Sequence, residues 1–258
     1  MAFTSILITG VLGHIGRHIS RHYLERGWDV YGYTRDGYFK CVWWPLSGDT
    51  DSKSQVVFDD NYSFMLVRID SDTARAPDVD VLVNAMGGGG DHESWLNTSE
   101  QKWSEVYLSN VTIPMRIAAE VTARMKGRQC GRVINIASVA AVKPLDVGPE
   151  YSAAKAGCIS ATASLAKDLA GSGVTANCIS PGLVATQGVK KILKERYGFC
   201  SNDETDFNRF VSENVFPSLT SNLITISQLI GIIDFINSDY AVNITGQNIV
   251  ADGGYSLL

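Results

Sequence analysis

The chain has 258 residues, 45% of them hydrophobic and 19% charged, which is ample apolar material for one large α/β domain. A net charge of -5 and a pI near 5.4 argue against nucleic acid or an anionic membrane as the main partner. Five cysteines form no Cys-x-x-Cys pair, and the apolar start lacks a basic leader, so we expect a cytoplasmic protein with no membrane anchor.

Strand-like and helix-like segments alternate along the chain without an internal repeat. Short apolar runs predict strands, and longer periodic segments predict helices. In chain order we expect a strand at 5–9, a helix at 14–26, strands at 29–34 and 79–84, a helix at 99–126, a strand at 132–137, a helix at 150–170, a strand at 174–179, a helix at 224–236 and a strand at 248–250. This alternation predicts an α/β fold: a Rossmann-type, doubly wound parallel β-sheet with helices on both faces, in a single domain spanning 1–258.

Two segments do not follow this alternation. Residues 36–63 show no clear period. Residues 186–222 are mixed, with helical patches at 190–197 and 204–214. Long insertions near strand ends often form lids or substrate walls, so we expect a substrate lid at 186–222.

A glycine-rich turn joins the first strand to the first helix, in Thr9-Gly10-Val11-Leu12-Gly13-His14-Ile15-Gly16. Glycines permit a tight turn and let backbone N–H groups approach a pyrophosphate, which the helix N-terminus attracts. Placed between a strand and a helix, the motif predicts a dinucleotide site. The cofactor-binding residues expected in this loop are Gly10, Gly13, His14, Ile15 and Gly16.

The end of the second strand bears on the choice of dinucleotide. An NAD site usually carries an acid there for the ribose hydroxyls, but this strand ends Tyr33-Thr34-Arg35, with no acid before Asp36. Arg35 is placed to pair with a 2′-phosphate, which favours NADP(H), with NAD(H) as the alternative. A solvated surface arginine is the competing interpretation.

His14, His18 and His22 share one face of the predicted helix, a spacing that metal ligands can use. No carboxylate or cysteine joins them at a suitable spacing, and the helix is amphipathic. We therefore expect a solvated helix face and no metal site.

Tyr151 and Lys155 lie four residues apart in a predicted helix, so the phenol and the ammonium project from the same face. A lysine beside a phenol favours the phenolate, and such a tyrosine can exchange a proton with a carbonyl or alcohol oxygen. On its own this spacing is more typical of an exposed helical turn than of a catalytic pair. Ser138 lies thirteen residues upstream of Tyr151, at the end of an apolar run.

With these motifs in this order, the chain resembles the short-chain dehydrogenase/reductase family, in its compact single-domain branch, over nearly its whole length. Further marks of the resemblance are Asn84-Ala85-Met86-Gly87, Asn110, the run from Pro181 to Thr186, and Asp252-Gly253-Gly254. The resemblance implies an NAD(P)(H)-dependent ketoreductase, similar to 3-oxoacyl-thioester reductases, which interconverts a carbonyl and a secondary alcohol. It also implies a small-molecule substrate and a homo-oligomer, either a tetramer or a dimer.

The resemblance implies roles for matched positions. Tyr151 would protonate the substrate oxygen, Lys155 would hold the nicotinamide ribose, and Ser138 would bind the carbonyl oxygen. Asn110 would hold a water that connects Lys155 to solvent. The other implied cofactor contacts are Asn84, Ala85, Gly87, Pro181, Gly182, Val184 and Thr186.

The chain departs from the family pattern in the glycine turn and after the fourth strand. His14 stands where the compact branch usually has its middle glycine, and Gly13 takes the place used by the extended branch, which acts on nucleotide sugars. The family's paired asparagines become Asn84 and Ala85.

The adenine pocket is a further departure. An aspartate that contacts adenine normally ends the third strand, and we expect Asp70 in this role, with Asp49 as the rival. Only nine residues separate Asp70 from Asp80, too few for the usual helix and turns.

Two other functions compete with a ketoreductase. A nucleotide-sugar epimerase or dehydratase is suggested by the glycine spacing, although the Ser138–Tyr151 interval and the Asp252-Gly253-Gly254 ending fit the compact branch better. A catalytically silent NADP-binding regulator would have no need of the polar set Ser138, Tyr151, Lys155 and Asn110.

Overall fold

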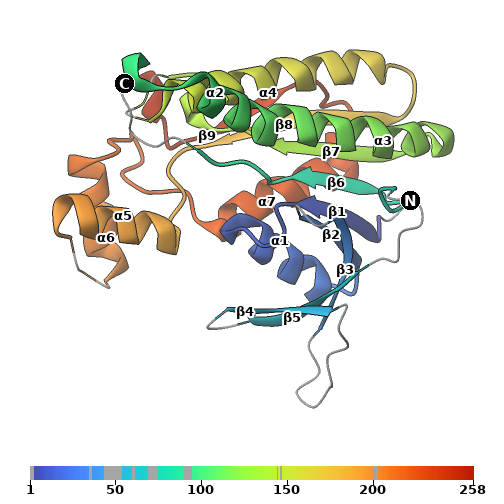
Figure 1. The fold of residues 1–258 in the computed structure, drawn as a ribbon, viewed down its shortest axis with the longest axis horizontal. Coiled ribbons are helices and arrows are strands. Elements are labelled where there is room, and N and C mark those ends of the chain that lie inside the picture. Colours follow the sequence, from blue (N-terminus) through green and yellow to red (C-terminus); the bar gives the residue numbers. More distant parts are fainter. Residues whose placement is uncertain are drawn as a thin grey trace.

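The computed structural model describes residues 3–34, 37–43, 54–59, 62–68, 75–89, 95–143, 145, 147–199, 201 and 203–258. These residues form a nine-stranded sheet of order β4-β5-β3-β2-β1-β6-β7-β8-β9 (Figure 1). Six adjacent strands, from β2 to β9 in that order, are parallel. They are β1 (Ser5–Thr9), β2 (Asp29–Thr34), β6 (Val81–Asn84), β7 (Gly131–Ile136), β8 (Val174–Pro181) and β9 (Asn248–Ala251).

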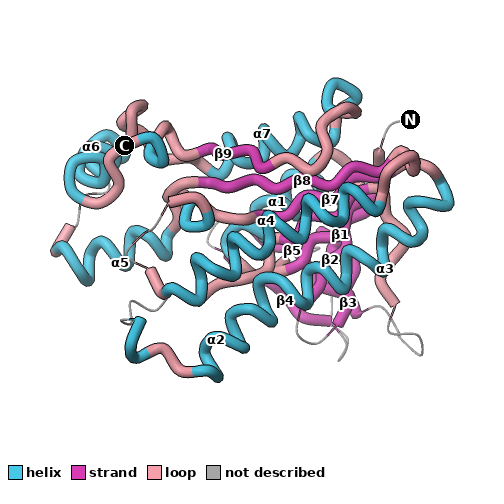
Figure 2. Tube along the Cα trace, turned by 90° about the horizontal axis from the view of Figure 1, so that it is seen from above, coloured by secondary structure: helices cyan, strands magenta, loops and turns pink. Residues whose placement is uncertain are grey.

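Helices cover both faces of this parallel region, and Figure 2 shows α7 on one side of the strands and α2, α3 and α4 on the other. The helices are α1 (His14–Glu25), α2 (Glu100–Tyr107), α3 (Ile113–Arg128), α4 (Pro149–Asp168), α5 (Gln187–Tyr197), α6 (Glu204–Asn214) and α7 (Ile226–Asn237). Successive strand residues point to opposite faces. Ile6 and Ile8 accordingly pack in the cluster with α1 and α7, whereas Leu7 packs with α3 and α4. The predicted doubly wound fold is confirmed.

The predicted helix at 99–126 is interrupted by a π-helical turn. A π-helical turn at Leu108–Thr112 joins α2 to α3, so the two helices follow one another with a locally widened backbone. Such turns are rare and are frequent at functional sites. This turn contains Asn110.

The sheet extends beyond β2 through three antiparallel strands that the sequence did not predict. These are β3 (Gly37–Trp43), β4 (Ser54–Asp59) and β5 (Tyr62–Arg68). Thr34 pairs with Gly37, and only two residues separate them. A parallel crossover needs a dozen or more residues, so β3 can only return antiparallel beside β2.

This extension changes the neighbour of β2. The neighbour of β2 on this side is the antiparallel strand β3, and β5, the strand that precedes Asp70, lies on the far side of β3. The expectation that Asp70 contacts adenine remains a prediction. Asp70 itself, its rival Asp49, and Arg35 lie outside the described residues.

The segment predicted as a lid contains α5 and α6, which form a lobe at one end of the molecule (Figure 1). The lobe has an apolar cluster of its own, to which α5 contributes Leu193 and α6 contributes Phe207 and Val211. Val139, which directly follows Ser138, packs in the same cluster. The lobe is therefore attached next to the carboxyl end of β7.

The structure also bears on the cysteines and on the expected lack of a membrane span. Cys41, Cys158 and Cys178 are buried free thiols, as expected of small core residues. In the part of the chain that the structure describes, no helix is both long and apolar enough to cross a bilayer.

Close backbone packing explains two glycines of the turn after β1. Gly10 has φ +70°, and a Cβ there would lie 2.8 Å from the Cα of Met86, which follows β6. A Cβ on Gly16 would overlap the carbonyl oxygen of Gly10. The turn is thus pressed between the first residues of α1 and the segment after β6.

We expect Gly16→Ala to destabilise the protein by about 1–3 kcal/mol, as overpacking does when the obstructing atom belongs to the backbone. Gly127→Ala is the matched control in α3, where nothing lies within 4 Å, and it should gain about 0.5–1 kcal/mol from helix propensity. Urea unfolding of both variants measures the two effects. Equal stability of the two variants would contradict the packing described here.

Candidate active site

The side chains predicted to do chemistry gather at the carboxyl edge of the parallel strands. Ser138 lies two residues after β7. Asn110 lies in the π turn between α2 and α3, on the same face of the sheet as the first turns of α4. In parallel sheets, ligands bind outside this edge. These side chains therefore lie where a ligand is expected to bind.

Lys155 is held at the end of β7. Its side chain is buried, and Nζ donates a hydrogen bond to the carbonyl oxygen of Ile136 at 2.9 Å. The same ammonium lies 5.6 Å from the centroid of the Tyr151 ring, one helical turn earlier in α4. A buried charge needs such partners because it has lost its water.

Asn110 reaches the same region from the π-helical turn. Its Nδ2 donates to the carbonyl oxygens of Val106 at 2.8 Å and Gly88 at 2.9 Å, while Oδ1 is buried without a hydrogen-bond partner among the described residues. A buried acceptor without a partner is costly and calls for a ligand or an ordered water.

Gly87 lies between Asn110 and Lys155. Its φ is +124°, and a Cβ there would overlap Asn110 Oδ1 and lie 3.3 Å from Lys155 Nζ. A side chain at this position would displace the amide of Asn110 or the ammonium of Lys155. Glycine therefore allows both groups to pack closely against the backbone of residue 87.

Ser138 caps the short 3₁₀ turn Val139–Ala141, where its Oγ accepts a hydrogen bond from the N–H of Ala140 at 3.1 Å. Its neighbour Ala137 packs in one cluster with Ala154 and Tyr151 of α4. The hydroxyl is partly exposed, and its own hydrogen remains able to bond a ligand.

A buried chain of polar side chains lies beneath this site. Asn84 Nδ2 donates to Asn135 Oδ1 at 2.7 Å, and Asn135 Nδ2 donates to Thr162 Oγ1 at 2.7 Å. Thr162 in turn donates to the carbonyl oxygen of Cys158 in α4. The chain links β6, β7 and α4.

Asn84, which was predicted to line the cofactor cleft, therefore has its side chain in the interior, where Nδ2 also donates to the carbonyl oxygen of Pro114. The reason is that Asn84 ends a strand buried on both faces, so its amide must bond within the protein. Sequence reasoning missed Asn135 and Thr162. The signal for Asn135 was a polar residue inside the apolar run Val133-Ile134-Asn135-Ile136.

The other expected cofactor residues lie along the same edge. Gly10, Gly13, His14, Ile15 and Gly16 form the turn into α1, Ala85 follows β6, and Pro181 ends β8. Gly182 packs against Asp252 and Phe216, Val184 bridges to Ile224, and Thr186 caps α5 through a hydrogen bond from the N–H of Val189.

These residues fit a dinucleotide. The turn at Gly10 and Gly16 has no room for side chains, which is the form of a cradle that brings backbone N–H groups close to a diphosphate. Gly87 and Asn110 Oδ1, which has no partner among the described residues, lie beside Lys155 on the same edge, directly after Met86, whose backbone packs against Gly10.

The three histidines on α1 make contacts of a different kind from metal ligation. His22 Nε2 lies 3.0 Å from Asp234 Oδ2, and the rings of His14 and His18 lie 4.8 Å apart. Among the described residues, no group of three His, Cys, Asp or Glu side chains could hold a metal ion.

Comparisons with known proteins agree with this geometry. A family model described as short chain dehydrogenase matches residues 4–197. The 3-oxoacyl-acyl-carrier-protein reductase FabG of Vibrio cholerae is 28% identical over 252 residues, which are 98% of this chain and 97% of the relative. An acetoacetyl-CoA reductase from Acinetobacter is 31% identical over 193 residues, 73% of this chain and 77% of that one. A crystal structure of an oxidoreductase of the short chain dehydrogenase/reductase family from Burkholderia thailandensis matches with a TM-score of 0.74 at 25% identity, covering 100% of this chain and 94% of the other.

We expect Gly87→Ala to lower the affinity for NADPH or NADH by roughly tenfold or more, because the new methyl group must displace Asn110 or Lys155, and displacements of about 1 Å at such sites can cost 100-fold. Gly88→Ala is the matched control, since nothing lies within 4 Å of its Cβ position. Cofactor fluorescence on titration measures both affinities. If the two variants bound equally well, the close packing at Gly87 would have no functional meaning.

Proposed function

Since the chain belongs to the short-chain dehydrogenase family, we propose that it is an NAD(P)(H)-dependent ketoreductase that interconverts a carbonyl and a secondary alcohol. One arrangement of side chains supports this function above all. The Lys155 ammonium, fixed on the Ile136 carbonyl, lies beside the Tyr151 ring, and Asn110 faces it across Gly87. The relatives whose names describe ketoacyl and acetoacetyl-CoA reduction support the same reaction class.

In the proposed reaction, the bound nicotinamide supplies or accepts the hydride. Tyr151 gives its phenolic proton to the substrate oxygen during reduction and takes it back during oxidation. Ser138 donates a hydrogen bond to the same oxygen, because the contact with the Ala140 N–H uses one of its lone pairs and leaves the hydroxyl hydrogen available. Lys155 stabilises the negative charge that develops on the Tyr151 oxygen as the proton leaves.

A proton must then return to Tyr151 from solvent. Lys155 Nζ has donors beyond the one that bonds Ile136, and Asn110 Oδ1 is a buried acceptor without a partner among the described residues, so in the proposed relay an ordered water bonds both groups. This water satisfies the buried amide oxygen and extends the proton path away from Tyr151. Asn110 is thereby a positioning residue for the relay.

We propose that the lobe of α5 and α6 forms the predicted lid over the substrate. It packs on Val139 beside Ser138, and its ring pairs Phe199–Phe210 and Phe199–Phe207 lie 4.4 Å and 6.1 Å apart. A cover of this kind suits a substrate with an apolar chain, such as a ketoacyl thioester.

We also propose a cytoplasmic homo-oligomer, a tetramer or a dimer. The outer face of α4 is lined by exposed small residues at Ala153, Ala156 and Ala163, which allow another helix to approach closely. The exposed side chains of Tyr107 and Leu108 on the neighbouring helix provide apolar area beside them.

We expect Tyr151→Phe to lower the rate of carbonyl reduction by about 10²–10⁴-fold, because the ring is kept while the transferable proton is lost. The measurement is NADPH or NADH oxidation at saturating acetoacetyl-CoA, after a screen of ketones, keto-sugars and quinones. Tyr240→Phe is the control, since that ring is 91% exposed on the surface and lies far along the chain from the site.

Near-normal turnover in the Tyr151 variant would overturn the proposed role of the phenol. Tight cofactor binding by the unmodified protein without turnover of any substrate in the screen would instead favour a silent dinucleotide-binding regulator.

For the cofactor we propose a preference for NADP(H), which is supported by Arg35 and by the lack of an acid before Asp36. Arg35→Ala should raise the KM for NADPH much more than the KM for NADH, because only NADPH carries a 2′-phosphate for the guanidinium to bind. Steady-state kinetics with both cofactors test this preference. Equal changes in the two KM values would remove the assignment.

A further inference from the structure

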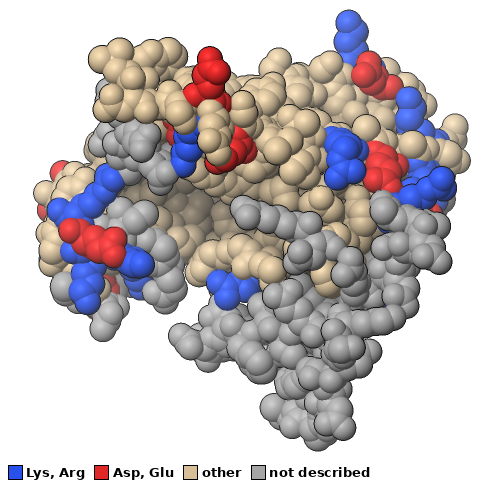
Figure 3. Space-filling view, viewed as in Figure 1, with Lys and Arg blue, Asp and Glu red and all other residues tan. Residues whose placement is uncertain are grey.

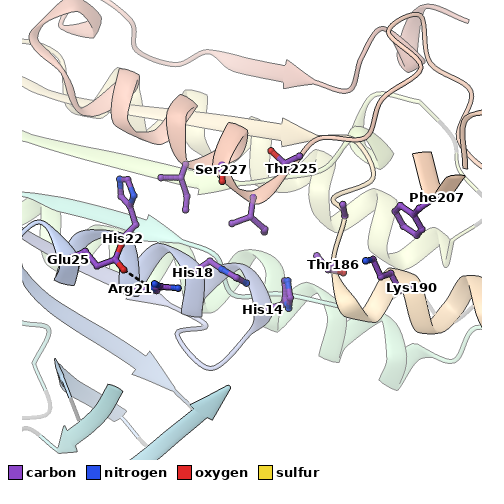
Figure 4. A pocket seen from close by; sticks show the side chains of 13 residues that line it. His14, His18, Arg21, His22, Glu25, Thr186, Lys190, Phe207, Thr225 and Ser227 are labelled. Atoms are coloured by element: carbon purple, nitrogen blue, oxygen red, sulfur yellow. Dashed lines mark hydrogen bonds and ion pairs between the residues drawn. The ribbon is translucent and has the colours of Figure 1, made fainter. Parts of the chain in front are cut away.

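A cavity of about 660 Å³ between α1, α5 and α7 borders the cofactor edge described above. Figure 3 shows the hollow between the lobe of α5 and α6 and the body that carries α1. His14 and Thr186, two of the expected cofactor contacts, lie on its wall, and Arg21 there is neutralised by Glu25 at 2.6 Å (Figure 4). This cavity therefore belongs to the proposed cofactor site.

Another cavity, of about 420 Å³, lies at the opposite edge of the sheet, where β7 and β8 begin. Phe3, Arg132, Thr175 and Asp239 are among the residues that line it. None of the residues predicted to bind the cofactor or to transfer a proton is part of the lining. The volume is within the range of ligand sites.

Arg132 is a buried cation on the wall of this cavity. The residue is 4% exposed, Nη1 donates to the carbonyl oxygen of Gly131 at 3.0 Å, and Nε is buried without a partner among the described residues. Burial lowers the pKa of the guanidinium from its ordinary high value, yet an arginine stays charged at neutral pH. The Phe3 ring, whose centroid lies 5.1 Å from Cζ, supports part of this charge. A buried charge is costly unless hydrogen bonds and an opposite charge compensate it, and here no carboxylate of the described chain forms an ion pair with it.

Thr175 stands directly beside Arg132, because the two residues are partners in the register of β7 and β8. Side chains at paired positions of neighbouring strands point to the same face of a sheet. The hydroxyl of Thr175 is also buried without a hydrogen-bond partner among the described residues. Two adjacent positions of one cavity therefore carry buried polar groups that call for a ligand.

The charges around the cavity favour a ligand with a single negative charge. Asp239 is the only carboxylate among the described lining residues, and it lies exposed on the surface. Its charge acts on Arg132 and opposes a second negative charge on a ligand, as a phosphate would carry. Leu169 and Val242 add apolar surface to the wall.

We propose that this cavity binds a small monocarboxylate, whose oxygens accept hydrogen bonds from the guanidinium of Arg132 and the hydroxyl of Thr175. The planar fork of an arginine matches a carboxylate, and an arginine that stacks on an aromatic ring still presents its N–H groups at the edge. The apolar wall receives the hydrocarbon part of the ligand. The site is separate from the proposed active site, since the Ile136 carbonyl that holds Lys155 lies roughly 13 Å further along β7 at about 3.3 Å per residue.

Titration calorimetry of the full chain with sodium hexanoate tests the site, with 1-hexanol as the matched ligand that lacks the charge. We expect hexanoate to bind with a Kd of about 1 mM or tighter, and hexanol to bind much more weakly. Arg132→Gln should weaken hexanoate binding about tenfold or more, because it removes a charge-assisted hydrogen bond. Arg209→Gln is the matched control: it makes the same change of charge, but Arg209 is exposed, pairs with Asp206 at 2.6 Å and does not line the cavity. It should bind within about twofold of the unmodified protein.

Thr175→Val tests the second donor without removing a buried charge. The hydroxyl has no partner in the described protein, so its loss should leave the thermal unfolding midpoint unchanged or raise it. The affinity for hexanoate should nevertheless fall about fivefold, because the carboxylate loses a hydrogen bond. A purely structural role of Thr175 would not separate these two measurements. This variant also keeps the site testable if Arg132→Gln fails to fold.

Absence of hexanoate binding, or equal affinity in the Arg132, Thr175 and Arg209 variants, would overturn the site. Tighter binding of inorganic phosphate than of hexanoate would overturn the assignment to a monocarboxylate. The proposed reductase and this site fail independently, since Tyr151→Phe should abolish carbonyl reduction and leave hexanoate binding unchanged.

Discussion

The buried chain Asn84–Asn135–Thr162 is the contact on which the site depends, because it joins two central strands to the helix that carries Tyr151 and Lys155. All three side chains are almost completely buried, so none of their amide or hydroxyl groups can turn to water instead. A shift that breaks either of its two side-chain hydrogen bonds leaves further polar groups unpaired in a low-dielectric interior, in addition to Asn84 Oδ1, which is buried without a partner among the described residues. The position of α4 against β7 follows from it, and so does the distance at which Lys155 meets the Ile136 carbonyl.

Beside this network, two local irregularities meet at the site. The helix that passes the site widens into a π turn at Asn110, and the loop after β6 has a positive φ at Gly87. Together they bring the amide oxygen of Asn110 and the ammonium of Lys155 close to the same backbone position. Departures from regular structure at one place, supported by regular packing elsewhere, are what a functional site is expected to show.

The parallel part of the sheet contributes residues to the proposed site, whereas the antiparallel part extends the sheet beyond β2. The six parallel strands end along one edge and provide the glycine turn, Ser138 and the segment that begins at Pro181. On the other side of β2 lies the antiparallel strand β3, whose first residue, Gly37, pairs with the last residue of β2. The proposed hydride and proton chemistry depends only on the parallel part.

The sequence by itself determined the elements and motifs that depend on neighbouring residues. Three local patterns are present in the structure. Ile6 and Ile8 point to one face of the sheet and Leu7 to the other, a glycine turn precedes α1, and Tyr151 and Lys155 lie one turn apart in α4. Only the tertiary structure decided which distant residues meet. The side chain of Asn84 lies in the interior, where it bonds Asn135, which in turn bonds Thr162. Strand β5 is not a neighbour of β2, because β3 pairs with that edge of β2. The periodicity of one segment carries no information about its partner, so pairing and burial were settled by packing alone.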